Sequence, residues 1–281
     1  MIKNTSAIEK IDALILCGGL GRRLRNVVNN RQKCMAEVNG RPFLDFLIGY
    51  LESYKIKRII LCLGFKSKTV RSYYEKRRAD GEILFSEEDL PLGTAGAIKN
   101  AKMLIKSNLF LVLNGDSICR VNLDSFLAFH KEKRAAATIG LVKSIRKKNT
   151  ADYGLVQLNK EQEVNRFAEK TTLSTHPGLK PGVCSGLILS GSSLPRPEGR
   201  GLEAAEVSNK KGNFISCGIY LFEKELLNLI PKKSYYSLEY DLFPRLKNRF
   251  YGYIADDILI DIGTPCRYKE AQNYLRGRID G

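Results

Sequence analysis

Short apolar runs alternate with amphipathic stretches through the first half of the chain. The runs at 11–17, 59–63, 83–85 and 109–113 are rich in aliphatic residues, which is typical of strands buried on both faces of a sheet. Residues 42–54 place apolar side chains at helical spacing and begin with a proline, which suits a first helical turn. The alternation continues to about residue 142. It predicts an α/β fold with a doubly wound, Rossmann-like, mostly parallel sheet flanked by helices.

The pattern changes after residue 150. Residues 154–158, 164–168 and 214–222 are shorter strand-like pieces, which we expect to form a smaller lobe. Between them, residues 171–213 are dominated by Thr, Ser, Gly, Pro and Lys, and they predict a long irregular insertion. No sharp linker separates the two parts. We therefore predict one domain over 1–281, made of a first part, 1–150, and a second part, 151–281.

Charge is the strongest feature of the composition. The net charge of +16 predicts attraction to an anionic partner: phosphorylated small molecules, nucleic acid or a membrane surface. No helix-turn-helix, RNP or zinc-finger pattern surrounds the basic runs, and no stretch approaches the roughly 18 apolar residues of a membrane span. The seven scattered cysteines form no CxxC pair, which favours a reducing cytoplasm. We expect a cytoplasmic protein that binds neither nucleic acid nor membrane.

The first predicted strand leads directly into a glycine- and arginine-rich loop. This loop contains Gly18, Gly19, Gly21 and Arg23, and Lys33 follows it. Glycines after a strand let backbone N–H groups approach a polyphosphate, while Arg and Lys supply the charge that phosphoryl transfer requires. The spacing matches neither a dinucleotide fingerprint nor a Walker A loop. On the glycines alone, an ordinary strand-to-helix turn explains the loop equally well.

The loop resembles the signature of the sugar-1-phosphate nucleotidyltransferases, which reads GG-x-GTRL followed by a Pro-Lys pair. Other motifs follow in the order of that family: PLGTAG at 91–96, NGD at 114–116, FAEK at 167–170, CGIY at 217–220 and DIGTP at 261–265. Within the family, VNGRPFL at 38–44 and NGDS at 114–117 are most similar to bacterial D-glycero-D-manno-heptose 1-phosphate guanylyltransferases and GDP-mannose-forming relatives. The resemblance covers nearly the whole chain.

This resemblance implies a Mg²⁺-dependent transfer. An NTP, here GTP, and a sugar 1-phosphate, heptose first and mannose second, would give an NDP-sugar and pyrophosphate for cell-surface polysaccharides such as lipopolysaccharide or capsule. The first part would bind the nucleotide and the second the sugar. By resemblance, Gly18, Gly19 and Gly21 hold the phosphates, and Arg23 and Lys33 neutralise charge during attack. The partners would be the two small-molecule substrates, and the sequence leaves open whether the chain forms a homo-oligomer.

Two aspartates follow apolar strand-like runs. Asp116 comes after 109–113 and Asp261 after 258–260, at strand ends where this architecture places metal-holding carboxylates. Mg²⁺ prefers one or two protein carboxylates together with phosphate oxygens and water, so this pair would suffice. Taken alone, each aspartate could equally cap a turn. On the sugar side the resemblance implies Gly154, Glu169 and Lys170, although Glu169 and Lys170 could also be a surface ion pair.

Glu88 and Gly93 lie in the region that the family uses to read the base. A carboxylate only accepts hydrogen bonds, so Glu88 suits the N1–H and N2 amino donors of guanine, and the N3–H of uracil remains open. Gly93 would let the backbone approach a planar ring. The alternative for Glu88 is a solvated acidic turn with its neighbours Glu87 and Asp89.

Three positions depart from the family pattern. Arg22 replaces a threonine, Gln32 replaces the proline before Lys33, and Ser216-Cys217 replaces Asn-Ala. Losing the proline is expected to loosen the loop that aims Lys33. His130 is expected on a helix surface. The rival functions are a UTP- or dTTP-dependent glucose 1-phosphate enzyme, a GT-A-type glycosyltransferase, for which an Asp-x-Asp motif would be expected, and a non-catalytic binder.

Overall fold

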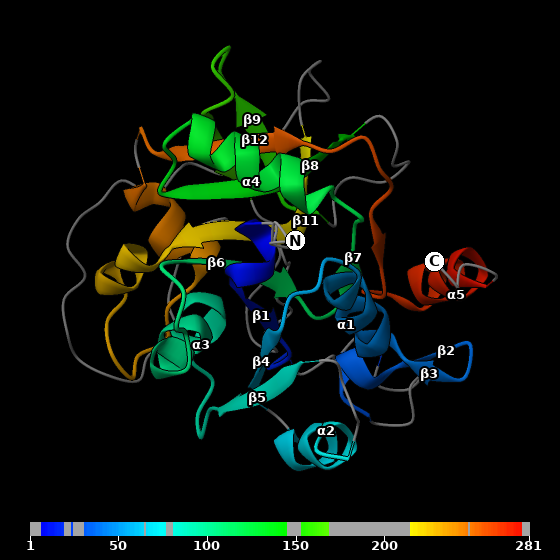
Figure 1. Cartoon of the computed structure of the whole chain (residues 1–281). Helices are drawn as coiled ribbons and strands as arrows, with labels where there is room; N and C mark the ends of the chain where they lie inside the picture. Colours follow the sequence, from blue (N-terminus) through cyan, green and yellow to red (C-terminus); the bar gives the residue numbers. More distant parts are fainter. Residues whose placement is uncertain are drawn as a thin grey trace, which may run out of the picture.

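The computed structural model describes residues 7–19, 24, 31–64, 66–76, 81–144, 153–168, 214–246 and 248–276. The predicted insertion at 171–213 therefore lies outside the described residues. A central nine-stranded sheet organises the rest, with helices packed around it (Figure 1). Its strands are β1 Asp12–Leu16, β4 Arg58–Leu63, β5 Glu82–Glu87, β6 Leu109–Asn114, β8 Ala137–Lys143, β9 Leu155–Leu158, β10 Val164–Ala168, β11 Phe214–Glu223 and β12 Phe250–Ile254.

The strand order is that of a doubly wound fold. Four neighbouring strands run in the order β6-β1-β4-β5, with β5 at the edge of the sheet, and are all parallel. The chain builds outward from β1 through β4 to β5 and then returns to place β6 on the other side of β1. The direction of winding therefore reverses between β1 and β6, and ligands of such sheets bind at the carboxyl ends of the strands at this point. The predicted fold class is confirmed.

Short elements and helices complete the structure. Two two-stranded pairs lie outside the main sheet, β2 Glu37–Val38 with β3 Arg41–Pro42, and β7 Ser117–Ile118 with β13 Ile260–Asp261. The α-helices are α1 Phe43–Ser53, α2 Ser67–Tyr74, α3 Gly93–Asn100, α4 Leu123–Glu132 and α5 Pro265–Leu275. Shorter helical turns are η1 Ala7–Lys10, η2 Lys33–Met35, η3 Ala101–Met103, η5 Lys224–Leu229, the π-helical η6 Leu238–Leu242 and η7 Phe243–Arg245.

Alternate residues of the central strands face two different hydrophobic clusters. Ile15 of β1 packs in a cluster with Leu47 of α1. Its neighbour Leu14 points to the opposite face and packs in a cluster with Ile98 of α3. Side chains alternate between the faces of a strand, so a strand covered on both sides must be apolar throughout. This explains why the sequence shows continuous apolar runs rather than alternation.

The second part of the chain extends the same sheet. β11 pairs antiparallel with β6, with Ile219 opposite Leu113 and Tyr220 opposite Val112. A register shift between Ser216 and Tyr220 contains Gly218, whose φ is +69°. A Cβ on Gly218 would lie 2.7 Å from Ser117 Oγ, so glycine is required there both for the conformation and for the space. The irregularity brings β11 against the end of β6.

The prediction that His130 lies on a helix surface is wrong. His130 is 1% exposed, because α4 turns this residue towards β8, where its Nδ1 lies 2.7 Å from Thr138 Oγ1. Burial lowers the pKa of His130 to about 4, so the imidazole is neutral near pH 7. The expected helix is present as α4, but His130 belongs to its buried face.

Candidate active site

The ends of β1 and β6 meet where the winding direction reverses. Gly18 and Gly19 follow β1, and Asp116 follows β6. The two strand ends are joined by a hydrogen bond of 3.0 Å from Gly115 N–H to the Leu16 carbonyl oxygen. Gly18, Gly19 and Asp116 thus lie at the edge of the sheet where the topology predicts a ligand.

Lys33 reaches Asp116 from the short turn η2. Its Nζ donates a hydrogen bond to Asp116 Oδ2 and forms an ion pair with it. The preceding residue, Gln32, is buried and donates from Nε2 to the Cys17 carbonyl oxygen at 3.3 Å, with φ at −59°. This φ is one that proline adopts. The expected loosening is therefore opposed, because Gln32 keeps a proline-like backbone and ties Lys33 to the end of β1.

Asp261 lies beside Asp116. In the β7–β13 pair Asp261 is opposite Ser117, and Ile262 N–H donates to the Asp116 carbonyl oxygen at 3.0 Å. Both carboxylates line the same cleft. The strand pairing thus brings together two aspartates that are far apart in the sequence.

Three donors hold the Asp261 carboxylate. Tyr153 OH donates to Oδ2 at 2.6 Å, Gly263 N–H donates to Oδ1 at 2.9 Å, and Arg267 Nη1 contacts Oδ1 and Oδ2 at 3.1 and 3.3 Å. The Arg267 guanidinium also lies over the Tyr153 ring, 4.9 Å from its centroid. Burial and the bond to Asp261 raise the pKa of Tyr153. We call Asp261, Tyr153, Gly263 and Arg267 the Asp261 cluster.

Sequence reasoning missed Tyr153 and Arg267. A usable signal existed for Arg267, because Thr264 caps α5 by accepting from Arg267 N–H at 3.4 Å, and Pro265 occupies the first helical turn. A residue in that first turn can reach back to the loop before the helix. Arg267 Nε does so by donating to Thr264 Oγ1 at 3.2 Å. Tyr153 directly precedes Gly154, but nothing in its local pattern marked it.

The cleft around the two aspartates encloses about 600 Å³ of empty space, part of which is open to solvent. Gly154 lines it, and its carbonyl oxygen accepts from Ser216 N–H at 3.0 Å. Three further groups of residues line the cleft: the aromatic residues Phe167 and Tyr220, the acidic residue Glu239, and the small polar residues Ser117 and Ser216. Charged groups thus occupy the cleft together with apolar ring surfaces.

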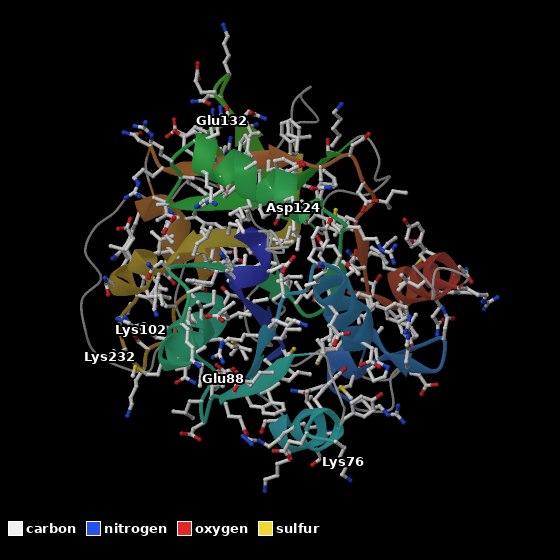
Figure 2. The ribbon with its side chains drawn as sticks, in the orientation of Figure 1. Lys76, Glu88, Lys102, Asp124, Glu132 and Lys232 are labelled. Atoms are coloured by element: carbon white, nitrogen blue, oxygen red, sulfur yellow. The ribbon has the colours of Figure 1, made fainter. Side chains whose placement is uncertain are left out.

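Glu88 lies in the segment that joins β5 to α3 (Figure 2), beside Gly18 at the start of the glycine loop. A Cβ on Gly18 or Gly64 would lie 2.7 or 2.5 Å from Glu88 Oε1, so both glycines make room for this carboxylate. Oε2 accepts from Leu92 N–H at 3.0 Å. Burial raises the pKa of the Glu88 carboxyl, and the bond from Leu92 opposes that rise. Glu88 is partly buried against the loop rather than fully solvated.

Gly93 has a role that the sequence did not predict. It begins α3 with φ at +72°, and a Cβ there would lie 2.7 Å from the Tyr236 carbonyl oxygen. That oxygen accepts from Ala95 N–H and Gly96 N–H at 2.9 and 3.0 Å. Gly93 is therefore required for packing the start of α3 against Tyr236, whether or not a ring approaches its backbone.

Four of the predicted site residues lie outside the described residues: Gly21, Arg23, Glu169 and Lys170. Of the others, Lys33, Asp116, Gly154 and Asp261 line the one cleft, while Gly18, Gly19, Glu88 and Gly93 follow the ends of β1 and β5. Within the described ranges, no group of three or more His, Cys, Asp or Glu side chains converges as a metal site, and no helix is long and apolar enough to cross a membrane.

Comparison with known proteins shows the family of the chain. The family model described as nucleotidyl transferase matches residues 12–277. The chain belongs to this family. It is 30% identical over 271 residues to the D-glycero-alpha-D-manno-heptose 1-phosphate guanylyltransferase of Aneurinibacillus thermoaerophilus, covering 96% of this chain and 100% of that protein.

Two further relatives of the family are similar to the chain. The mannose-1-phosphate guanylyltransferase of Mycobacterium tuberculosis is 27% identical, over 98% of this chain and 65% of that protein. The crystal structure of HddC from Yersinia pseudotuberculosis complexed with GMP-PN matches with a TM-score of 0.71 and 27% identity. The match covers 94% of this chain and 99% of HddC.

Proposed function

We propose that this member of the nucleotidyl transferase family is a sugar-1-phosphate guanylyltransferase. Its substrates would be GTP and a manno-configured sugar 1-phosphate, with D-glycero-D-manno-heptose 1-phosphate preferred over mannose 1-phosphate. The observation that carries the proposal is the cleft in which Lys33, Asp116 and Asp261 meet at the β1–β6 switch point. The heptose 1-phosphate guanylyltransferase similar to the chain over its full length supports the choice of substrates.

The reaction needs no protein nucleophile. A phosphate oxygen of the sugar 1-phosphate attacks the α-phosphorus of GTP, the bond from that phosphorus to the bridging oxygen breaks, and pyrophosphate leaves. Catalysis is then positioning and charge stabilisation. Lys33 and Arg23 neutralise charge on the triphosphate, and the backbone N–H groups of Gly18, Gly19 and Gly21 hold its phosphates.

The two aspartates suit magnesium as the cofactor. Mg²⁺ takes one or two protein carboxylates and completes its shell with phosphate oxygens and water, and Asp116 and Asp261 supply two carboxylates in one cleft. A larger all-protein set of ligands is not required. When bound, the ion would offset charge on the phosphates. Lys33 would then exchange its contact with Asp116 for one with the triphosphate.

Glu88 supports guanine as the base. Its carboxylate lies against Gly18, one of the glycines that would hold the phosphates, and it can accept from both guanine donors. The sugar would occupy the side of the cleft formed by Gly154, with Glu169 and Lys170 contacting its hydroxyls and phosphate. Phe167 and Tyr220, which line the cleft, would give its apolar side hydrophobic contacts.

The cellular setting follows from the chemistry. Both substrates are soluble phosphorylated molecules, so we propose a cytoplasmic enzyme that requires neither nucleic acid nor membrane. Its NDP-sugar product would supply cell-surface polysaccharide synthesis, such as lipopolysaccharide or capsule. A homo-oligomer is compatible with this function.

One assay tests the proposal. Pyrophosphate release is measured with Mg²⁺, a panel of NTPs and a panel of sugar 1-phosphates, and the highest kcat/KM is expected for GTP with the heptose. A preference for UTP or dTTP with glucose 1-phosphate would reject the substrates but keep the transferase. No release with any pair would reject the transferase.

A further inference from the structure

The two carboxylates of the cleft differ in how much access they offer to a cation. The Asp116 side chain is 39% exposed and contacts a lysine, whereas that of Asp261 is 10% exposed. Both oxygens of Asp261 already accept: Oδ1 from Gly263 N–H and Arg267, Oδ2 from Tyr153 and Arg267. A cation arriving at Asp261 would therefore share the carboxylate with the Arg267 guanidinium.

Arg267 cannot give up its charge. A guanidinium stays protonated throughout the working pH range, and its planar fork is held by Thr264 Oγ1 and by the Tyr153 ring. A second cation at the same carboxylate is therefore opposed by a fixed positive charge. Lys33 adds another positive charge at Asp116.

We propose that Arg267 is a positioning residue with a second effect: it holds Asp261 in place and keeps the cleft from binding a divalent cation before the nucleotide arrives. The inference rests on the proposed function, because it assumes that Asp261 holds the cofactor. The negative triphosphate reverses the balance by offsetting the charges of Lys33 and Arg267. The divalent cation then enters with GTP rather than ahead of it.

Removing Arg267 has two opposed consequences. Loss of an orienting contact weakens a metal site, while loss of a neighbouring positive charge strengthens it. In the Asp261 cluster the second effect is the larger, because Tyr153 OH and Gly263 N–H still restrain one oxygen each. A purely structural arginine would give only the first effect.

The test measures Mn²⁺ binding in the absence of nucleotide, with the electron paramagnetic resonance signal of the free ion as the readout. Wild type is expected to bind Mn²⁺ weakly, and Arg267→Gln about tenfold more tightly. Arg267→Lys keeps the positive charge and is expected to stay near wild type. Arg249→Gln is the matched control, because it removes an equal charge from an exposed pair with Glu225 and should change nothing.

Several results would overturn the inference. The first is tight Mn²⁺ binding by the wild-type protein in the absence of nucleotide. The second is unchanged or weaker Mn²⁺ binding by Arg267→Gln. The third is an increase in Mn²⁺ affinity in Arg267→Lys or Arg249→Gln equal to that in Arg267→Gln. If Arg267→Gln does not fold by circular dichroism, Arg267→Met replaces it, since its aliphatic chain can still cover the Tyr153 ring. Mn²⁺ binding needs no turnover, so the result stands apart from the pyrophosphate assay that tests the transferase.

Discussion

The two sides of the cleft are built differently. The side from the first part of the chain places Gly18, Gly19 and Asp116 at strand ends and Lys33 on the short turn η2, with a partly exposed ion pair between Lys33 and Asp116. The side from the second part fixes Asp261 within a buried cluster of aromatic, cationic and backbone donors. The first arrangement can exchange partners when substrate arrives, and the second keeps one carboxylate in place.

The largest expected difference between the two sides is the loss of stability when each aspartate is neutralised. Asp261→Asn removes the charged partner of the partly buried Arg267, and the free energy of unfolding should fall by about 3 kcal/mol. Asp116→Asn affects a more exposed pair, and the loss should stay below about 1 kcal/mol. Urea denaturation measures both. Equal losses would show that the two sides are held alike, even if both variants lose turnover.

Substitution of Lys33 tests the side of the cleft that contains the Lys33–Asp116 ion pair. Lys33→Ala should lose roughly a hundredfold or more in kcat while remaining folded, because a group that stabilises the transition-state charge is removed. We expect the same of Arg23→Ala. Arg31→Ala is the control, since Arg31 is exposed and pairs with Glu37 at 3.4 Å outside the cleft. Near-normal turnover in folded Lys33→Ala and Arg23→Ala would exclude them from catalysis.

Substitution of Glu88 tests whether the first side of the cleft also recognises the base of the nucleotide. Glu88→Gln keeps the size but trades an acceptor for a donor, so kcat/KM for GTP should fall by roughly 1–3 kcal/mol, and that for other NTPs by less. Glu87→Gln is the matched control, since Glu87 pairs with Arg71 at 2.7 Å. An equal fall across all nucleotides would leave Glu88 a structural role only.

The raised pKa of Glu88 adds a pH signature to this comparison. Burial favours the neutral carboxyl, so protonation begins at a higher pH than in a solvated glutamate. The preference for GTP should therefore weaken as the pH falls, and the weakening should begin at a higher pH than it would for a solvated glutamate. The ratio of kcat/KM for GTP to that for UTP, measured against pH, follows this loss. A ratio that does not depend on pH would remove Glu88 from base recognition.

Gln32 should give the smallest effect. Gln32→Ala removes the bond to the Cys17 carbonyl oxygen and should lower kcat by about fivefold, since a single neutral hydrogen bond contributes about 1 kcal/mol. Gln32→Pro fixes φ close to the observed −59° and should recover part of that loss. Steady-state kinetics of the two variants decide this. A proline variant slower than the alanine variant would mean that the side-chain bond alone aims Lys33.

Local patterns were enough to predict most of the framework. Continuous apolar runs predicted β1, β4, β5 and β6, and helical spacing predicted α1 to within one residue at each end, because strand and helix periods are written into neighbouring residues. The same locality placed Gly18, Gly19 and Asp116 at strand ends. The family motifs added the activity, which no periodicity contains.

The contacts that give the site its character depend on the fold. Asp116 and Asp261 meet only because β7 pairs with β13, and Tyr153 and Arg267 reach the same carboxylate from two other segments. Packing also determines that position 93 must be glycine, because a side chain there would clash with the Tyr236 carbonyl oxygen. Packing likewise buries His130 against β8. Such pairings depend on sheet order and helix orientation, which arise from the packing of the whole chain. A residue and its sequence neighbours carry no record of which distant side chain will lie opposite.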